Sequence, residues 1–373
     1  MKKIVFLTGT RADFGKLKSL ISILQIGEAF DAHIFVTGMH MQELYGYTLI
    51  EIQKSGFKNI HTFKNHTHET TMDLTLAKTI EGFSAYVNKL RPDLIVIHGD
   101  RVEALAGAIV GSLNNILVAH IEGGELSGTI DELIRHATSK LSHIHFVAND
   151  LAKNRLIQMG ELPDSIYTIG SPDIDIMFSN TLPTLAVVKD YYNIHFESYG
   201  IAMFHPVTTE IGNMSTYAHN FVSALVASGK QYVVIYPNND LGSEHILRAY
   251  KQFDDNTNFR VFPSLRFEYF LTLLKHAEFT IGNSSAGIRE APCYGIPSIN
   301  VGTRQYNRST NQSIINTTYD VVSIEKGIKE IYNIAGIVDI SYGKGNSANG
   351  FLNSLQLDKF WSINHQKQFV DII

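Results

Sequence analysis

Residues 94–124 read LIVIHGDRVEALAGAIVGSLNNILVAHIEGG, and this stretch decides the fold class. Two short apolar runs rich in β-branched residues, 94–98 and 116–121, stand on either side of a helical pattern. Runs this short and this apolar are typical of parallel strands that helices cover on both faces. The stretch therefore predicts a strand, a helix and a second strand of one parallel sheet.

The same alternation extends in both directions almost to the end of the chain. Further strands are predicted at KIVFL, HIFVT, IHFVA and IYTI in the first half, and at IAMF, YVVIY, RVF, FTI, PSINV and YDVVSI in the second. The 373 residues exceed one ordinary domain and suit two of roughly 150–200 residues each. We therefore expect an α/β protein with two Rossmann-like, doubly wound domains that face a cleft.

The boundary between the two arrays is expected at about Pro172, followed by a linker with a helix up to about residue 198. Residues 343–350, GKGNSANG, are expected to form a flexible polar loop. Residues 355–373 have helical spacing, which predicts a terminal helix that packs back on one of the domains.

The composition excludes several classes of protein. A net charge of −5 argues against a surface for nucleic acid or anionic membrane, and the single cysteine, Cys293, excludes a disulfide framework. The first apolar run stops at Leu7, too short for a secretory signal. The longest nearly apolar stretch, 104–113, is far below the ~20 residues of a membrane span. We expect a cytoplasmic protein that binds neither nucleic acid nor membrane.

Candidate site residues follow the predicted strands directly. Ligands of open parallel sheets bind beyond the carboxyl ends of the strands. In the first half, Arg11, Asp100 and Glu122 lie at or just beyond such ends, and in the second half His205 and the loop 282–287 do so. Two sheets that face each other would therefore line one cleft with charged and small polar residues.

Three carboxylates form an acidic set. Asp100 and Glu122 end strands that look like neighbours, and Asp131 lies just inside the start of the next helix. Carboxylates that converge on a cleft could serve acid/base chemistry if their environments separate their pKa values. The alternatives are a first-turn helix acid for Asp131 and a hydrogen-bonded loop residue for Asp100. His205 joins this set through its position at a strand end.

The motif GNSSAGIRE, residues 282–290, follows a strand and is predicted to open a helix. Backbone N–H groups and the helix dipole at such a start favour a phosphate, with hydroxyls from Ser284 and Ser285. Glu290, on the same predicted helix, could bond ribose hydroxyls. The alternative is a plain helix cap with a tight glycine turn.

The motif GTRADFGK near the start of the chain lacks the spacing of a dinucleotide fingerprint and of a P-loop, so NAD is not indicated. Arg11 and Lys16 could supply positive charge for a phosphate, and exposed basic residues are the alternative. His61, His66 and His68 with Glu69 lie in a polar loop without a helical i, i+4 pair. No metal and no cofactor are therefore expected.

Several long motifs carry a resemblance to a known family. These motifs are HGDRVEALAG, HIEGGELSGTIDELIRHATSKLSHIHFVAN, IGSPDIDIM and GNSSAGIREA, together with the opening GTRADFGKL and with VTGMHM. On these motifs the sequence resembles the hydrolysing UDP-N-acetylglucosamine 2-epimerases of bacterial sialic-acid biosynthesis. The resemblance implies the two-domain glycosyltransferase-B architecture with a returning last helix, hence domains 1–172 plus 356–373 and 173–355.

The resemblance also implies an activity. Members of this family convert UDP-N-acetylglucosamine and water into N-acetylmannosamine and UDP, by loss of UDP to a glycal and addition of water, without metal or nicotinamide. The implied substrate is a UDP-sugar, and the implied assembly is a homodimer or homotetramer. The implied acid/base residues are Asp100, Glu122 and Asp131, with His205 for the leaving group. The implied UDP-binding residues are Arg11, Ser284, Ser285, Gly287 and Glu290.

Two departures separate this chain from relatives that only epimerise. Those relatives carry Glu-Ala-Gly at Glu122-Gly123-Gly124, and Asp-Ser-Gly-Gly at residues 283–286, which here read Asn-Ser-Ser-Ala. Both favour the hydrolysing branch. The main alternative is a hydrolysing 2-epimerase of UDP-2,4-diacetamido-2,4,6-trideoxyhexose for legionaminic acid. A glycosyltransferase and a non-catalytic sugar-nucleotide sensor fit the acidic set less well.

Overall fold

The computed structural model describes residues 1–66, 71–127, 130–306, 308–334 and 336–371. The chain divides into two compact units. The first unit comprises Met1–Glu125, Asp131–Thr181 and Ser341–Ile373, and the second comprises Leu126–Ile130 and Leu182–Ile340. The chain thus leaves the first unit at Thr181 and returns to it at Ser341. The sequence predicted these two boundaries at residues 172 and 356 instead.

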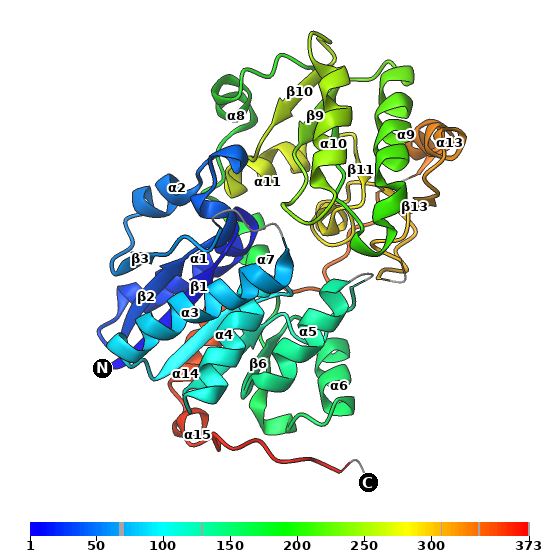
Figure 1. The fold of residues 1–373 in the computed structure, drawn as a ribbon. Coiled ribbons are helices and arrows are strands. Elements are labelled where there is room, and N and C mark those ends of the chain that lie inside the picture. Colours follow the sequence, from blue (N-terminus) through cyan, green and yellow to red (C-terminus); the bar gives the residue numbers. More distant parts are fainter. Residues whose placement is uncertain (67–70, 128–129, 307, 335, 372–373) are drawn as a thin grey trace. The chain divides into compact units, whose positions relative to one another are not determined.

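The first unit is built on a seven-stranded parallel sheet in the order β3-β2-β1-β4-β5-β6-β7 (Figure 1). The strands are β1 Lys2–Thr8, β2 Phe30–Val36, β3 Ile60–Thr62, β4 Leu94–His98, β5 Leu117–Ile121, β6 Ile144–Val147 and β7 Ile166–Thr168. The helices are α1 Arg11–Ile26, α2 Leu49–Lys54, α3 Met72–Leu90, α4 Val102–Leu113, α5 Ile130–Leu141, α6 Asp150–Gln158, α7 Pro172–Met177, α14 Ser347–Leu355 and α15 Asp358–Trp361.

Helices cover both faces of this sheet, which explains why its strands are apolar throughout. In β1, Ile4 and Phe6 pack in a core with α1 and α14, while Val5 and Leu7 pack in a second core with α3 and α4. Side chains alternate between the two faces of a strand, so a strand buried on both faces has no polar positions to spare.

The second unit contains a six-stranded parallel sheet in the order β10-β9-β8-β11-β12-β13. The strands are β8 Gly200–Met203, β9 Tyr232–Ile235, β10 Phe259–Phe262, β11 Phe279–Gly282, β12 Ser298–Val301 and β13 Ile314–Thr317. The helices are α8 Leu185–Tyr191, α9 Met214–Ala227, α10 Ser243–Tyr250, α11 Phe267–Lys275, α12 Glu290–Cys293 and α13 Val321–Glu330. The doubly wound α/β fold class predicted from the sequence is confirmed.

Both sheets share a strand order that reverses direction next to their first strand. The reversal lies between β1 and β4 in the first unit and between β8 and β11 in the second. Ligands of doubly wound sheets bind beyond the carboxyl ends of the strands at this switch point. Asp100 follows β4 and His205 follows β8, so both residues lie where the topology places a site.

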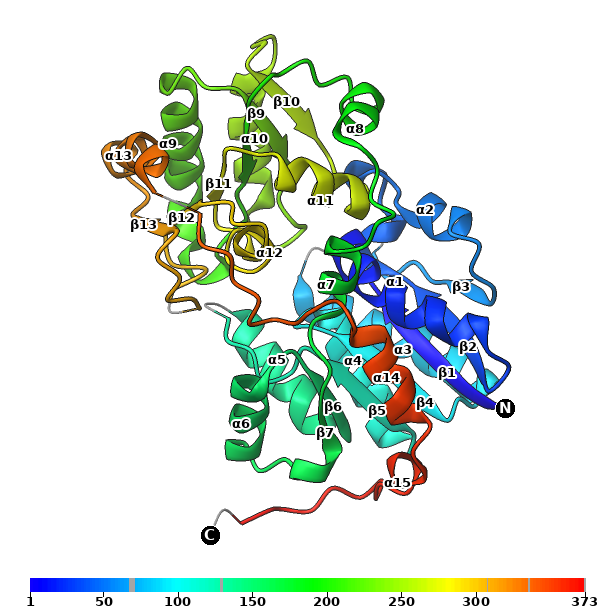
Figure 2. The same cartoon turned by 180° about the vertical axis from the view of Figure 1, so that it is seen from behind.

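The prediction for the end of the chain was wrong in its details. The helix α14 begins at Ser347, inside the predicted polar loop, and no helix continues beyond Trp361 in the described residues up to 371 (Figure 2). Asp175 accepts hydrogen bonds from the main-chain N–H groups of Ser347 and Ala348. The helix start is therefore stabilised by a residue that is remote in the sequence.

The stretch YDVVSI, predicted as a strand, instead starts the helix α13. Asp320 caps this helix by accepting a hydrogen bond from the N–H of Ser323 at 2.8 Å. The last strand is the preceding β13. Two adjacent valines favoured a strand in the sequence, but the Asp320 cap and the helical spacing of Ile324 and Ile328 determine the local structure.

Candidate active site

One guanidinium joins the two loops that follow β4 and β5. Arg135 of α5 is 3% exposed, and it forms an ion pair with the carboxylate of Asp100. Its Nη1 donates a hydrogen bond of 2.6 Å to the main-chain carbonyl of Glu122. Gly99, with φ of +74°, makes the turn that leads from β4 to Asp100. The structure therefore brings Asp100 and Glu122 together around Arg135.

The carboxylate of Glu122 is buried among polar groups. The residue is 3% exposed, and its backbone has φ of +65°, a conformation that costs a non-glycine residue about 1–3 kcal/mol. Ser171 donates a hydrogen bond to Oε1, and His98 Nε2 lies 3.1 Å from Oε2. Strain at a residue held this firmly is typical of a functional position.

Lys16 is a second buried cation of this site, in addition to Arg135. A capping box of Thr10 and Asp13 starts α1, and Lys16 lies on its buried face. Its Nζ lies 3.5 Å from Glu122 Oε1 and 3.4 Å from Asp173 Oδ2. The sequence suggested that Lys16 could supply charge to a phosphate, whereas the structure places it against two carboxylates.

Arg11 lies on the same helix as Lys16, and Asp131 lies on the same helix as Arg135. Arg11 begins α1 and forms an ion pair with Glu51 at 2.6 Å. Asp131 lies in the first turn of α5, where an acidic side chain interacts favourably with the helix dipole. It precedes Arg135 by four residues, so the two share one face of the helix.

In the second unit, Asn283 ties the loops after β8 and β11 together. Its Oδ1 accepts a hydrogen bond of 2.6 Å from the N–H of His205, and its Nδ2 donates one of 2.9 Å to the carbonyl of His205. The His205 Nδ1 accepts a hydrogen bond of 3.0 Å from the N–H of Asn238. Neutral His205 therefore carries its proton on Nε2.

The loop with the two serines is less helical than predicted. Ser285–Gly287 form a single 3-10 turn, and Glu290 begins the separate short helix α12, which contains Pro292. A helix dipole contributes little in such short elements, so main-chain N–H groups and hydroxyls are the remaining anion ligands. The hydroxyl of Ser284 accepts a hydrogen bond from the N–H of Ala286 at 3.3 Å.

A small pocket lies at the switch point of the second sheet. Ser284 and Gly287 line it, together with Met203 from β8 and Asn300 from β12. A side chain at Gly287 would bring a Cβ to 3.0 Å from Thr280 Oγ1, so the turn must approach the sheet closely here. Glu290 is buried behind this turn.

Sequence reasoning missed Arg135 and Ser171 as members of the site, while His98 was noted only for its position at the end of a strand. The available signal was a charged residue on a buried helix face: Arg135 shares its face with Ile134 and Thr138, and all three are buried. Lys16 has the same signal, because it lies between the buried residues Phe14 and Leu17. Long polar side chains on such a face need an internal partner.

The histidines that the sequence analysis considered as metal ligands do not form a metal site in the described residues. His61 stacks on Tyr86 with ring centroids 4.4 Å apart, and His68 and Glu69 lie outside the described residues. Within the described ranges, no group of three or more His, Cys, Asp or Glu side chains could hold a metal ion. In that same part of the chain, every helix is too short or too polar to cross a membrane.

Comparison with known proteins points to one family. The family model for UDP-N-acetylglucosamine 2-epimerase matches residues 24–356. A UDP-N-acetylglucosamine 2-epimerase of Neisseria meningitidis is 49% identical over 376 residues, which cover 100% of both chains. A UDP-N,N'-diacetylbacillosamine 2-epimerase (hydrolyzing) of Legionella pneumophila is 33% identical over 353 residues, 93% of this chain and 94% of its own.

A solved structure gives the same picture for the fold. The UDP-GlcNAc 2-epimerase of Methanocaldococcus jannaschii, in complex with UDP-GlcNAc and UDP, matches with a TM-score of 0.80 and 22% identity. The match covers 95% of this chain and 99% of that chain. It confirms the glycosyltransferase-B type of fold that the sequence predicted.

Proposed function

The chain belongs to the UDP-N-acetylglucosamine 2-epimerase family, and from this premise we propose that it is a hydrolysing member. It converts UDP-N-acetylglucosamine and water into N-acetylmannosamine and UDP for sialic-acid biosynthesis. The relative with 49% identity over its whole length supports this substrate, and Glu122-Gly123-Gly124 supports the hydrolysing branch.

The environment of Glu122 is the observation that carries the proposal. Its buried carboxylate follows β5 and lies beside Lys16 of α1 and His98 at the end of β4. The C2 proton of a sugar is not acidic until the C1–O bond weakens and positive charge builds on the ring. A fixed carboxylate next to C1 and C2 stabilises that charge, because it is already oriented when the charge develops.

The proposed reaction has two balanced steps. In the first, the C1–O bond breaks, UDP leaves with the electron pair, and the C2 proton passes to an enzyme base, which gives a glycal. In the second, the oxygen of water bonds to C1 and one water proton passes to an enzyme base, while an enzyme acid delivers a proton to C2 on the face opposite to the one that lost its proton. Asp100, Glu122 and Asp131 are the proposed acid/base groups for these proton transfers. No hydride moves, so the route takes no nicotinamide.

His205 is the proposed support for the leaving group. Its Nδ1 is occupied by the N–H of Asn238, so the Nε2–H is the side-chain donor that can stabilise charge on the departing phosphate. Arg11, Ser284, Ser285, Gly287 and Glu290 are the proposed ligands of the UDP phosphates and ribose. The position of Ser284, Ser285 and Gly287 just beyond the carboxyl end of β11, next to the switch point of the second sheet, supports this assignment.

Turnover of two sugars tests the substrate. We expect UDP release from UDP-N-acetylglucosamine without added cofactor, with N-acetylmannosamine as the sugar product. The alternative substrate is the 2,4-diacetamido-trideoxy sugar, which the name of the Legionella relative describes. Faster UDP release from that sugar at equal concentration would contradict the proposed substrate and keep the proposed chemistry. No UDP release from either sugar would contradict both.

The double variant Ser284→Ala, Ser285→Ala is expected to weaken UDP binding by about ten- to a hundredfold. Losing a hydrogen bond to a charged group costs about 1.5–3 kcal/mol, and the remaining main-chain N–H groups keep the combined loss near that of one bond. Calorimetric titration of UDP measures the change. Ser309→Ala is a matched control in the same unit, because that hydroxyl only accepts a hydrogen bond from the N–H of Asn311. Equal UDP affinity in the double variant and the control would remove both serines from the site.

The proposal includes a cytoplasmic homodimer or homotetramer. One chain has a mass of 41.7 kDa, so light scattering should give about two or four times this value. A particle with the mass of one chain would contradict this part of the proposal and leave the reaction untouched.

A further inference from the structure

His120 is a buried polar residue in an apolar strand. It lies on β5, two residues before Glu122, and it is 0% exposed. Side chains two positions apart share one face of a strand, so His120 points to the same side as Val118, which is part of the core with α3 and α4. An imidazole at such a position costs free energy unless both nitrogens have partners.

Both nitrogens of His120 have partners that define one protonation state. The Nε2 lies 2.7 Å from the main-chain carbonyl of Gly99, which only accepts, so Nε2 carries the proton. The Nδ1 lies 3.0 Å from Ser139 Oγ and accepts its proton. Burial, with smaller contributions from the charges of Arg135, His145 and His98, lowers the pKa of His120 to about 3.

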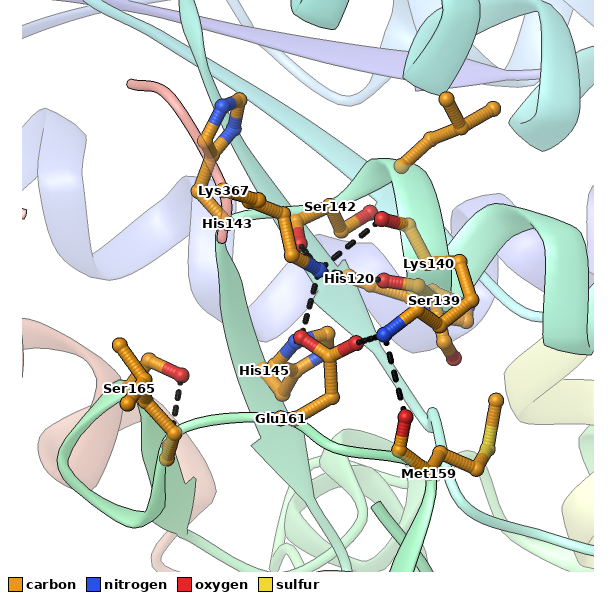
Figure 3. A network of polar contacts seen from close by, with 12 residues as sticks. His120, Ser139, Lys140, Ser142, His143, His145, Met159, Glu161, Ser165 and Lys367 are labelled. Carbon is orange, nitrogen blue, oxygen red and sulfur yellow. Dashed lines mark hydrogen bonds and ion pairs between the residues drawn. The ribbon is translucent and has the colours of Figure 1, made fainter. Parts of the chain in front are cut away.

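These two partners belong to the elements that hold the site. Gly99 immediately precedes Asp100, and Ser139 lies on α5 one turn after Arg135. Figure 3 shows His120 and Ser139 next to each other in the polar network of this region. His120 therefore connects the turn that carries Asp100 to the helix that carries the ion-pair partner of Asp100.

The loop after β5 packs directly on this pair. A Cβ added at Gly123 would lie 3.0 Å from His120 Nδ1 and 3.1 Å from Ser139 Oγ. Such distances are tighter than ordinary contacts, so a side chain at Gly123 would displace the imidazole or the hydroxyl. The position of Glu122 is thus coupled to the same hydrogen-bonded pair.

The last turn of α5 is also held by hydrogen bonds, so the helix that carries Ser139, the partner of His120, is fixed at both ends. Lys367 Nζ donates hydrogen bonds of 2.9 Å to the carbonyl of Lys140 and 2.6 Å to that of Ser142. A lysine at the carboxyl end of a helix satisfies carbonyls that have no partner within the helix (Figure 3). The helix α5 is therefore held at Arg135, at Ser139 and at its last turn.

We propose that His120 is a positioning residue of the reaction: its neutral imidazole holds the Gly99–Asp100 turn in register with α5 and with Glu122. The inference rests on the proposed function, since it assumes that Asp100 and Glu122 act on the sugar. His120 forms its hydrogen bonds with Ser139 and Gly99 and takes no proton in the proposed reaction.

The variant His120→Asn tests this role, with His143→Asn as the matched control. His143 is also a buried histidine with two partners, the N–H of Val118 and the carbonyl of His365, and it lies away from Asp100. We expect His120→Asn to lower kcat about 10–100-fold with KM within about twofold, because small misplacements of acid/base groups act on the transition state. We expect His143→Asn to keep kcat per folded enzyme.

A rescue variant separates positioning from simple loss of packing. In His120→Gln the side-chain amide occupies the place of Nε2 and can still donate to the carbonyl of Gly99, so it should recover at least half of the loss on a logarithmic scale. Equal kcat for His120→Asn and His143→Asn, or no recovery in His120→Gln, would overturn the proposal.

A crystal structure of each variant gives a readout that does not depend on turnover. We expect the Asp100–Arg135 ion pair to be displaced in His120→Asn and retained in His143→Asn. An undisplaced ion pair in His120→Asn would overturn the positioning role. If wild-type enzyme releases UDP from neither sugar, the proposed function fails, and this structural comparison still decides whether His120 holds the Asp100 turn.

Discussion

Glu122→Gln is expected to lower kcat for UDP release about 10²–10⁴-fold, the usual cost of losing one acid/base group. The amide keeps the size of the side chain and can still accept from Ser171, but it loses the charge that lies beside Lys16. Glutamine neither stabilises positive charge on the sugar nor exchanges a proton with it. Initial rates of UDP formation at saturating substrate measure the effect.

The control for this variant is Glu132→Gln. Glu132 lies in the same unit on α5 and pairs with His136 on the helix surface at 3.2 Å, in an i, i+4 geometry that contributes only a few tenths of a kcal/mol. Both variants should bind UDP like the wild type, because the proposed UDP ligands of the second unit are unchanged. Turnover by Glu122→Gln within a factor of three of the control would exclude Glu122 from the chemistry.

Glu161→Gln is expected to lower the free energy of unfolding of the first unit. Glu161 is buried and accepts from Lys140 at 2.8 Å and from Lys367 at 2.5 Å, and His145 Nε2 lies 2.9 Å away (Figure 3). Burial alone would raise its pKa, but the hydrogen bond with His145 and the two lysine charges outweigh burial and lower the pKa to about 2.

The sign of the pH dependence follows from this shift. A carboxyl whose pKa is lower in the folded state stabilises the fold above its unfolded pKa, and this contribution disappears as the pH falls toward the folded pKa. For Glu161 the contribution is at most about 3 kcal/mol at pH 7 and is lost between about pH 4.5 and pH 2. The wild type and Glu161→Gln should therefore differ most at neutral pH.

Trp361 gives a specific signal for this measurement. It is the only tryptophan and packs on Phe30 in the first unit, with ring centroids 6.3 Å apart. Urea unfolding followed by its fluorescence reports the first unit. Glu132→Gln is the control in the same unit, because its i, i+4 pair with His136 on the helix surface contributes about 0.2–0.5 kcal/mol. A difference between wild type and Glu161→Gln that stays constant from pH 7 to pH 3 would contradict the account.

The sequence predicted most strands because a strand buried on both faces must be apolar. The run LIVIH, for example, coincides with β4. The errors arose where a helix-capping side chain overrides the apolar pattern. The start of α14 depends on Asp175, which is remote in the chain, and YDVVSI became a helix through its Asp320 cap. Such contacts leave no trace in the periodicity of the sequence.

The site was predictable at strand ends and unpredictable beyond them. The rule that ligands bind beyond the carboxyl ends of parallel strands and the family resemblance nominated Asp100, Glu122 and His205 in advance. Their orienting partners come from other elements: Arg135 is on α5 and Lys16 is on α1. These partners are visible in the sequence only as charged residues on buried helix faces, a pattern that shows the need for a partner but not its identity.

The proposed reaction is an elimination and hydration at C1 and C2 of the sugar, and turnover in heavy water distinguishes this route from others. UDP-N-acetylglucosamine should give free UDP and N-acetylmannosamine that carries one deuterium at C2, because the original proton leaves and the new one comes from solvent. Mass spectrometry and proton NMR of the product measure this. N-acetylmannosamine with the original proton at C2, or a UDP-sugar epimer that keeps its UDP as the final product, would contradict the account.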